Sequence, residues 1–131
     1  MKRAGEAMDV IKKIHHVPIY VKDFERNLKF LNEVMGFPIV GTPIDKSLNV
    51  RFLKVGPDLI ELMDEHQFTR SCQCALLVDD IVEEMEALKK RGLKMGELEV
   101  FEMEEGKLNF VFFKKFDGGW IELLERVNWN P

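Results

Sequence analysis

The pattern of apolar residues along the chain repeats once. Residues 17–24 predict a strand that ends in an aspartate, and residues 74–81 predict a second such strand, 57 positions further on. In both, an apolar residue occupies every second position, which is typical of a strand with one buried face. The two apolar sets are Val17, Ile19 and Val21 in the first strand and Cys74, Leu76 and Val78 in the second.

A helical pattern follows each of these strands. Asp23 and Asp80 are suitable N-caps, and Gly36 and Gly92 are suitable C-terminal stops. An apolar stripe with helical spacing lies between each cap and stop. The stripes are Phe24, Leu28 and Leu31 in the first helix and Ile81, Met85 and Leu88 in the second.

Each predicted helix is followed by further strands. Residues 49–55 and 107–114 are rich in β-forming residues, and each run precedes a turn and an Ile-Glu-Leu tripeptide, at 60–62 and 121–123. With short strands near 38–42 and 95–101, each half becomes a β-α-β-β-β module. We therefore predict one α+β domain at residues 14–131, with module one at 14–64, module two at 72–126 and an N-terminal leader at 1–13.

Polar side chains occupy equivalent positions in the two modules. His16 precedes Val17, and Gln73 lies 57 positions after His16. Glu61 and Glu122 are the central residues of the two Ile-Glu-Leu tripeptides. Because neighbouring residues of a strand point to opposite faces, all four face away from the helices. An imidazole, an amide oxygen and two carboxylates form a plausible ligand set for a divalent metal, with two positions left for water or substrate.

Four segments resemble the vicinal oxygen chelate superfamily, which includes glyoxalase I, methylmalonyl-CoA epimerase, extradiol dioxygenases and bleomycin-binding proteins. They are residues 16–23, 31–37, 73–80 and 113–123. The resemblance implies a glyoxalase-like fold, in which paired βαβββ modules form a curved mixed sheet around a central metal. It also implies that the first and last strands of each module supply the ligands, here His16, Glu61, Gln73 and Glu122.

The chain departs from the pattern of that superfamily in three places. Gln73 stands where a histidine is common, and residues 115–118 replace the usual Asp-Pro-Asp-Gly turn. The connection at 63–71 is also short, which weakens the match to methylmalonyl-CoA epimerase.

The resemblance implies a metal-dependent lyase or isomerase of the glyoxalase I type. It would act on a small oxygen-rich substrate through a metal-stabilised enediolate-type intermediate, with Glu122 and Glu61 as catalytic residues. The divalent metal would be Ni, Zn, Co, Mn or Fe. The alternatives are a metal-free small-molecule binding protein of the bleomycin-resistance type, an epimerase-like activity, and a dioxygenase. Family analogy also implies a homodimer.

Composition excludes several other classes. The 131 residues include 19 Lys and Arg and 23 Asp and Glu, a net charge of −4, which argues against nucleic-acid binding. The longest uncharged stretch, 34–44, is far shorter than the roughly 20 residues of a membrane span. With Cys72 and Cys74 as the only cysteines and no signal-peptide pattern, we expect a cytoplasmic protein without disulfides or membrane contact.

Other side chains have structural interpretations. By alternation, His15 belongs to the Val17 side of its strand, which predicts a strand-end or surface histidine, and His66 falls in a loop. Three residues share faces with the proposed ligands and are candidates to line a pocket. They are Tyr20, Trp120 and Leu124.

Overall fold

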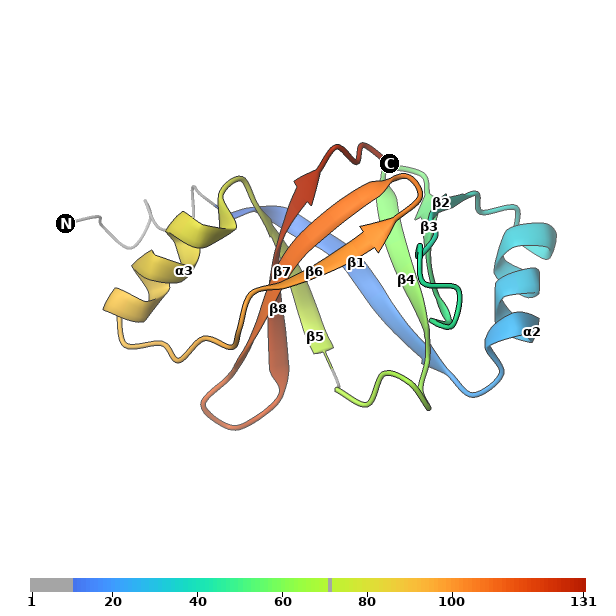
Figure 1. Ribbon diagram of the computed structural model, residues 1–131. Helices are drawn as coiled ribbons and strands as arrows, with labels where there is room; N and C mark the ends of the chain where they lie inside the picture. Colours follow the sequence, from blue (N-terminus) through green and yellow to red (C-terminus); the bar gives the residue numbers. More distant parts are fainter. Residues whose placement is uncertain (1–10, 71) are drawn as a thin grey trace.

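The computed structural model describes residues 11–70 and 72–131, which form an eight-stranded sheet with helices on its outer side (Figure 1). The strands are β1 (Ile11–Val21), β2 (Ile39–Gly41), β3 (Val50–Val55), β4 (Asp58–Asp64), β5 (Cys72–Val78), β6 (Glu99–Met103), β7 (Gly106–Lys114) and β8 (Trp120–Val127). The helices are α2 (Phe24–Lys29), which continues as the π-helical turn η1 (Phe30–Val34), and α3 (Ile81–Lys90). This element order confirms the α+β fold with two βαβββ modules. Of the expected leader, residues 11–13 belong to β1, and residues 1–10 lie outside the described residues.

The modules join through backbone pairing at the centre of the sheet. The strand order is β2-β3-β4-β1-β5-β8-β7-β6. Within each module the first and last strands run parallel, with Val17 opposite Ile60 and Cys74 opposite Ile121. Between the modules, β1 and β5 run antiparallel. The four central strands are therefore the four that carry the predicted site residues.

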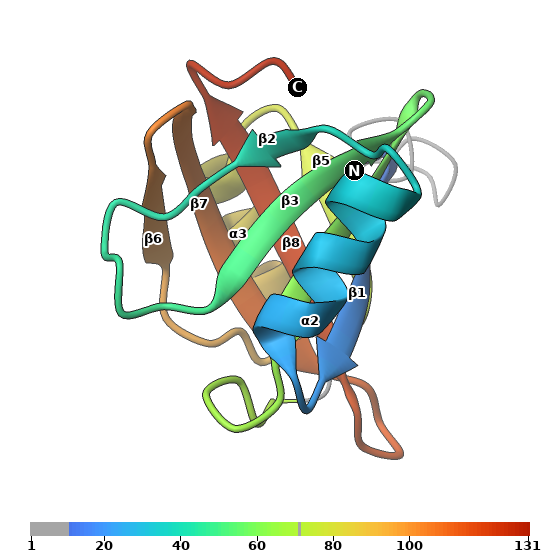
Figure 2. The same cartoon turned by 90° about the vertical axis from the view of Figure 1, so that its right-hand side faces the viewer.

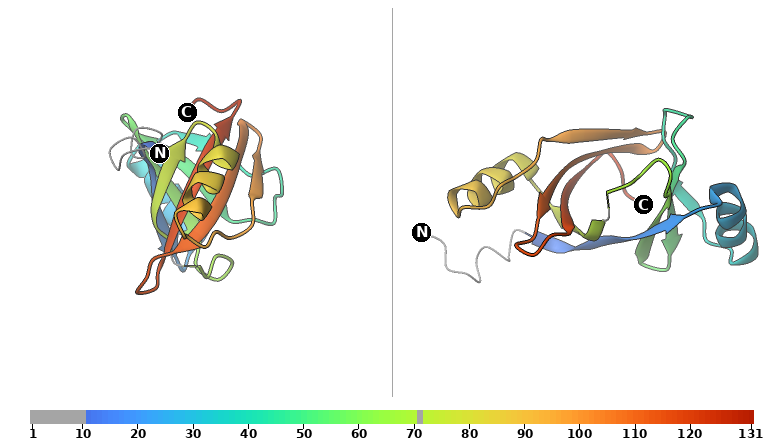
Figure 3. Two further views of the ribbon diagram at one scale, coloured as in Figure 1. Left: turned by 90° about the vertical axis from the view of Figure 1, so that its left-hand side faces the viewer. Right: turned by 90° about the horizontal axis from the view of Figure 1, so that it is seen from below.

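The sheet is strongly curved, and its two edges approach each other. The helices lie outside it at opposite ends, α2 beside module one and α3 beside module two (Figures 2 and 3). Beyond β2, Pro43 forms a bridge with Met103 at the end of β6, and the backbone N–H of Thr42 donates to the Glu105 carboxylate over 2.8 Å. These contacts nearly close the sheet and leave a concave inner face.

The helix ends confirm the sequence prediction. Asp23 and Asp80 are N-caps, and each carboxylate accepts a hydrogen bond from the backbone N–H three residues further on, over 3.1 Å. Gly36 and Gly92 follow the helices with φ values of 78° and 92°, a conformation that glycine adopts without strain. Within the described parts of the chain, no helix has the length and apolar character needed to cross a membrane.

The outer face of β1 is only partly covered by helix. Ile19 and Val21 pack against the buried Phe24 of α2, as alternation predicts. Val17 was expected to be buried in the same way, but its side chain is 56% exposed, and Ile14 is 64% exposed. Figure 1 shows the reason, because α2 and α3 lie at opposite ends and leave the middle of β1 between them.

Candidate functional site

Three of the four predicted ligands meet on the inner face of the sheet. The Nε2 atom of His16 lies 3.1 Å from Oε1 of Glu61 and 3.7 Å from Oε1 of Glu122. The three side chains come from β1, β4 and β8, so both modules contribute. His16 and Glu122 are buried, with 3% and 8% of their surfaces exposed. In each Ile-Glu-Leu tripeptide, the isoleucine and the leucine lie on the other face of the sheet, so the glutamate between them points inward.

The two glutamates line a cavity of about 560 Å³. This volume lies within the range of small-molecule sites, roughly 300–1,000 Å³. Tyr20 and Trp120 also line the cavity, in agreement with the sequence prediction, whereas Leu124 is fully buried in the hydrophobic core. The walls are mainly apolar and aromatic. They include Val50, Met63, Phe68, Phe101, Leu108, Phe110 and Phe112.

Burial and mutual charge control the protonation of this cluster. Burial raises the pKa of Glu122 from 4.5 to about 8; the charge of His16 opposes this rise, and the charge of Glu61 adds to it. For His16, burial lowers the pKa, but the charge and hydrogen bond of Glu61 and the charge of Glu122 outweigh burial, so the net pKa is raised. The two carboxyl groups therefore favour the protonated form of the imidazole that lies between them.

His15 is not the strand-end or surface residue that alternation predicted. It is 2% exposed and packs against the rings of Phe52 and Trp129, with centroid distances of 6.2 and 5.5 Å. The physical reason is a register shift between Ile14 and His16 in the β1–β5 pairing, which turns both histidines into the protein.

The two histidine rings are hydrogen-bonded to each other. Their Nδ1 atoms are 2.8 Å apart, so one must donate and the other accept. Burial and the charge of His16 lower the pKa of His15 to about 3, which keeps His15 neutral. Its Nε2 atom has no hydrogen-bond partner among the described residues. His15 thereby fixes the orientation of the His16 ring.

Gln73 lies outside the cluster, contrary to the expected inward position. Its side chain is exposed and lies beside Gly119 in the β7–β8 turn. A Cβ atom at Gly119 would be only 2.9 Å from the Gln73 Oε1 atom. The pairing of β5 with β8 shifts register between Cys72 and Cys74, and this irregularity breaks the alternation on which the prediction depended. Cys72 lines the cavity instead. Burial, together with the charge of Glu122, raises the pKa of its thiol to about 12.

Arg70, which the sequence analysis did not identify, lies beside the aromatic wall of the cavity. The Tyr20 hydroxyl donates to the Arg70 carbonyl over 2.9 Å and accepts a hydrogen bond from the backbone N–H of Cys72 over 3.0 Å. Tyr20 therefore fixes the backbone at the start of β5. Arg70 was missed because it lies in a loop, where residue spacing says nothing about the direction of a side chain.

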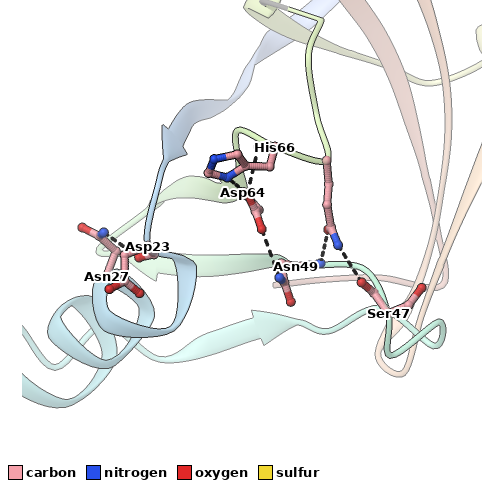
Figure 4. A network of polar contacts seen from close by, with 7 residues as sticks. Asp23, Asn27, Ser47, Asn49, Asp64 and His66 are labelled. Carbon is pink, nitrogen blue, oxygen red and sulfur yellow. Dashed lines mark hydrogen bonds and ion pairs between the residues drawn. The ribbon is translucent and has the colours of Figure 1, made fainter.

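Polar contacts hold the loop between β4 and β5 against module one (Figure 4). The Asp64 carboxylate accepts hydrogen bonds from the Asn49 side chain over 3.1 Å and from the His66 backbone over 2.9 Å. The Gln67 side chain accepts from the Asn49 backbone over 2.7 Å and donates to the Ser47 carbonyl over 2.8 Å. His66 is exposed in this loop, as predicted.

The donor types at the cluster match those that bind divalent cations. One imidazole and two carboxylates are suitable ligands, and a cation held by His16, Glu61 and Glu122 would offset the charge that burial disfavours. Within residues 11–70 and 72–131, however, no three or more His, Cys, Asp or Glu side chains are grouped so that they could hold a metal ion. The donor types therefore suit a divalent metal, but their present arrangement does not: His16 contacts Glu61 directly, and the fourth expected ligand lies elsewhere.

Comparison with known proteins agrees with this architecture. The family model of the glyoxalase/bleomycin resistance protein/dioxygenase superfamily matches residues 13–71. The uncharacterized protein YwbC of Bacillus subtilis (strain 168) is 28% identical over 88% of this chain and 98% of its own length. A probable chloroplastic lactoylglutathione lyase of Arabidopsis thaliana is 30% identical over 88% of this chain, which spans 36% of that protein.

Solved structures share the fold at low sequence identity. Methylmalonyl-CoA epimerase from Mycobacterium tuberculosis has a TM-score of 0.65 and 22% identity, with 88% of this chain and 89% of that one covered. A superfamily member from Vibrio splendidus 12B01 has a TM-score of 0.55 and 16% identity, with 86% and 99% covered. The paired βαβββ modules and the family model that matches residues 13–71 agree with these similarities. The chain has the fold of the glyoxalase/bleomycin resistance protein/dioxygenase superfamily, and its residues 13–71 resemble that superfamily in sequence.

Proposed function

We propose that the protein is a metal-dependent lyase or isomerase of the glyoxalase type that moves a proton on a small oxygen-rich substrate. The observation that carries this proposal is the contact of His16 with Glu61 and Glu122, the two glutamates that line the cavity. Two carboxyl groups beside a protonated imidazole in a largely apolar space form a suitable arrangement for proton transfer next to a carbonyl group.

Glu122 is the group that exchanges the proton in this proposal. Its carboxyl is 3.7 Å from the imidazole, whereas Glu61 is held at 3.1 Å, so Glu122 is freer to turn toward a substrate. A pKa of about 8 makes both protonation states accessible near neutral pH. Glu61 keeps His16 charged and oriented, and the aromatic walls exclude water from the reacting carbon.

A divalent cation would be held by His16, Glu61 and Glu122, and when bound it would supply positive charge that stabilises a developing enediolate-type oxyanion. The resemblance to the superfamily leaves the identity of the metal open among Ni, Zn, Co, Mn and Fe. Metal analysis of protein purified without chelator tests this part of the proposal. The result expected is a stoichiometric divalent metal that is lost in His16→Ala.

The proton transfer is tested by deuterium exchange followed by NMR. The probes are S-lactoylglutathione and methylmalonyl-CoA, the compounds in the names of the two relatives. In D₂O the protein should incorporate deuterium at the carbon next to the carbonyl of one probe, and Glu122→Gln should abolish this exchange. Glu102→Gln, which removes an exposed carboxylate of β6, serves as the matched control. Absence of both bound metal and exchange would contradict the proposal.

The second candidate is a metal-free binding protein of the bleomycin-resistance type. The direct contact between His16 and Glu61 favours it, because this pairing satisfies both groups without a cation. Such a protein would bind its ligand equally well in EDTA and would catalyse no exchange.

A homodimer is also part of the proposal. The exposed apolar residues Ile14 and Val17 form a surface on the outer side of β1 that a second copy can cover. Light scattering that shows only monomer would contradict it.

A further inference from the structure

The guanidinium of Arg70 lies against two aromatic side chains of the cavity wall. Its guanidinium carbon lies 4.3 Å from the ring centroid of Phe112 and 4.8 Å from that of Trp120. The two rings meet edge to face, with centroids 6.3 Å apart, so they form a corner in which the planar guanidinium lies. A guanidinium has five N–H donors, and contact with aromatic rings uses none of them as hydrogen bonds to oxygen, so they stay available to a ligand.

The backbone of Arg70 is fixed as firmly as its side chain. Its carbonyl accepts the Tyr20 hydroxyl bond, and the preceding loop is attached to module one through Gln67. The stacked guanidinium is therefore positioned before any ligand arrives, which reduces the entropy that binding must remove.

The ion pair of Arg70 is weak. Its Nη1 atom lies 3.7 Å from Oε2 of Glu99, beyond the 2.7–2.9 Å of a charge-assisted hydrogen bond, and both side chains are nearly half exposed. Among the described residues that line the cavity, Arg70 is the one Arg or Lys side chain. An anionic group on a ligand in the cavity is therefore attracted to Arg70.

We infer that Arg70 and the Phe112–Trp120 corner form a subsite for a ligand that combines a planar apolar group with a carboxylate. The carboxylate pairs with the edge of the Arg70 guanidinium and displaces Glu99, while the apolar group lies along the rings of Phe110 and Phe112, whose centroids are 5.6 Å apart. This inference deepens the proposed function, on which it rests for the assignment of the cavity as the substrate site.

Calorimetric binding of matched carboxylates and amides tests this subsite. The probes are benzoate, phenylacetate and hydrocinnamate, each compared with its neutral amide, in EDTA so that no metal can bind the carboxylate. In the wild-type protein at least one carboxylate should bind about tenfold more tightly than its amide, as expected for one charge-assisted pairing. Arg70→Gln should reduce this ratio to about one and leave the amide affinity unchanged.

Three further variants separate charge from stacking. Arg70→Lys keeps the charge but loses the planar fork, so the ratio should fall only in part. Glu99→Gln removes the competing carboxylate and should strengthen carboxylate binding. Phe112→Leu should weaken acid and amide alike.

The inference is overturned if no carboxylate exceeds its amide in the wild type, or if Arg70→Gln retains the preference. These measurements involve no turnover, so failure of the subsite and failure of the proton transfer are read out separately.

Discussion

Replacement of the buried carboxyl of Glu122 by an amide should stabilise the metal-free protein at high pH. The folded-state pKa of about 8 lies above the ordinary value of 4.5. Because the protonated form is the one that the fold favours, this group supports folding fully below about pH 4.5, and the support is lost as the pH rises through about 8. Glu122→Gln cannot ionise and has no such loss.

The magnitude follows from the size of the pKa change. Each pKa unit corresponds to about 1.4 kcal/mol. Because Glu122 ionises more readily in the unfolded chain than in the folded protein, its titration reduces the free energy of unfolding by about 3 kcal/mol at pH 7 and by about 5 kcal/mol above pH 8. Relative to the wild type, Glu122→Gln should therefore gain about 3 kcal/mol between pH 4.5 and pH 7.

Urea denaturation followed by tryptophan fluorescence measures this difference in EDTA across the same pH range. Glu102→Gln removes an equal charge from an exposed position of β6, and its difference from the wild type should stay nearly constant with pH. If Glu122→Gln and the wild type show the same pH dependence, the burial argument is wrong. Excess Zn²⁺ in place of EDTA should stabilise the wild type more than the variant, because the cation offsets the charge on Glu122.

Three other predictions concern positions in or near the site. Gln73→Ala should leave the metal content unchanged, because the Gln73 side chain lies by Gly119; loss of metal would contradict this placement. Gly41→Ala should lower the free energy of unfolding by about 1–3 kcal/mol in urea titration, because a Cβ there would lie 2.8 Å from the fully buried Phe52; unchanged stability would refute the close packing. As the pH falls from about 6.5 to about 3, the stability of His15→Phe relative to the wild type should rise in thermal denaturation, because the buried His15, with a pKa of about 3 against an ordinary 6.5, resists a proton that the unfolded chain accepts; a constant difference would contradict this reasoning.

The sequence predicted the parts of the site that lie on regular strands. β4 pairs with β1 and β8 with β7 without any register shift, so counting from the Ile-Glu-Leu tripeptides gives the correct face for Glu61 and Glu122. The same counting fails in β1 and β5, where register shifts turn His15 inward and Gln73 outward. A shift of one residue reverses every side chain beyond it, and single-sequence periodicity contains no signal for such a shift.

Loop residues and helix irregularities were also beyond prediction. The position of the Arg70 side chain depends on contacts with Phe112 and Trp120, which are distant in sequence. No local sequence pattern predicts such contacts. The π-helical turn at Phe30–Val34 has the same apolar spacing as an ordinary helix end. By contrast, the caps Asp23 and Asp80 were predictable, because capping depends on short-range hydrogen bonds.

The central position of the site in the sheet affects how the protein folds. His16 and Glu122 are separated by most of the chain, and the pairing of β1 with β5 and of β5 with β8 brings them together. Contacts of such high sequence separation form at the expense of loop-closure entropy and slow the folding of a domain. A ligand that binds both residues therefore stabilises the docked pair of modules rather than either one alone, so occupancy of the site is thermodynamically linked to unfolding of the whole domain.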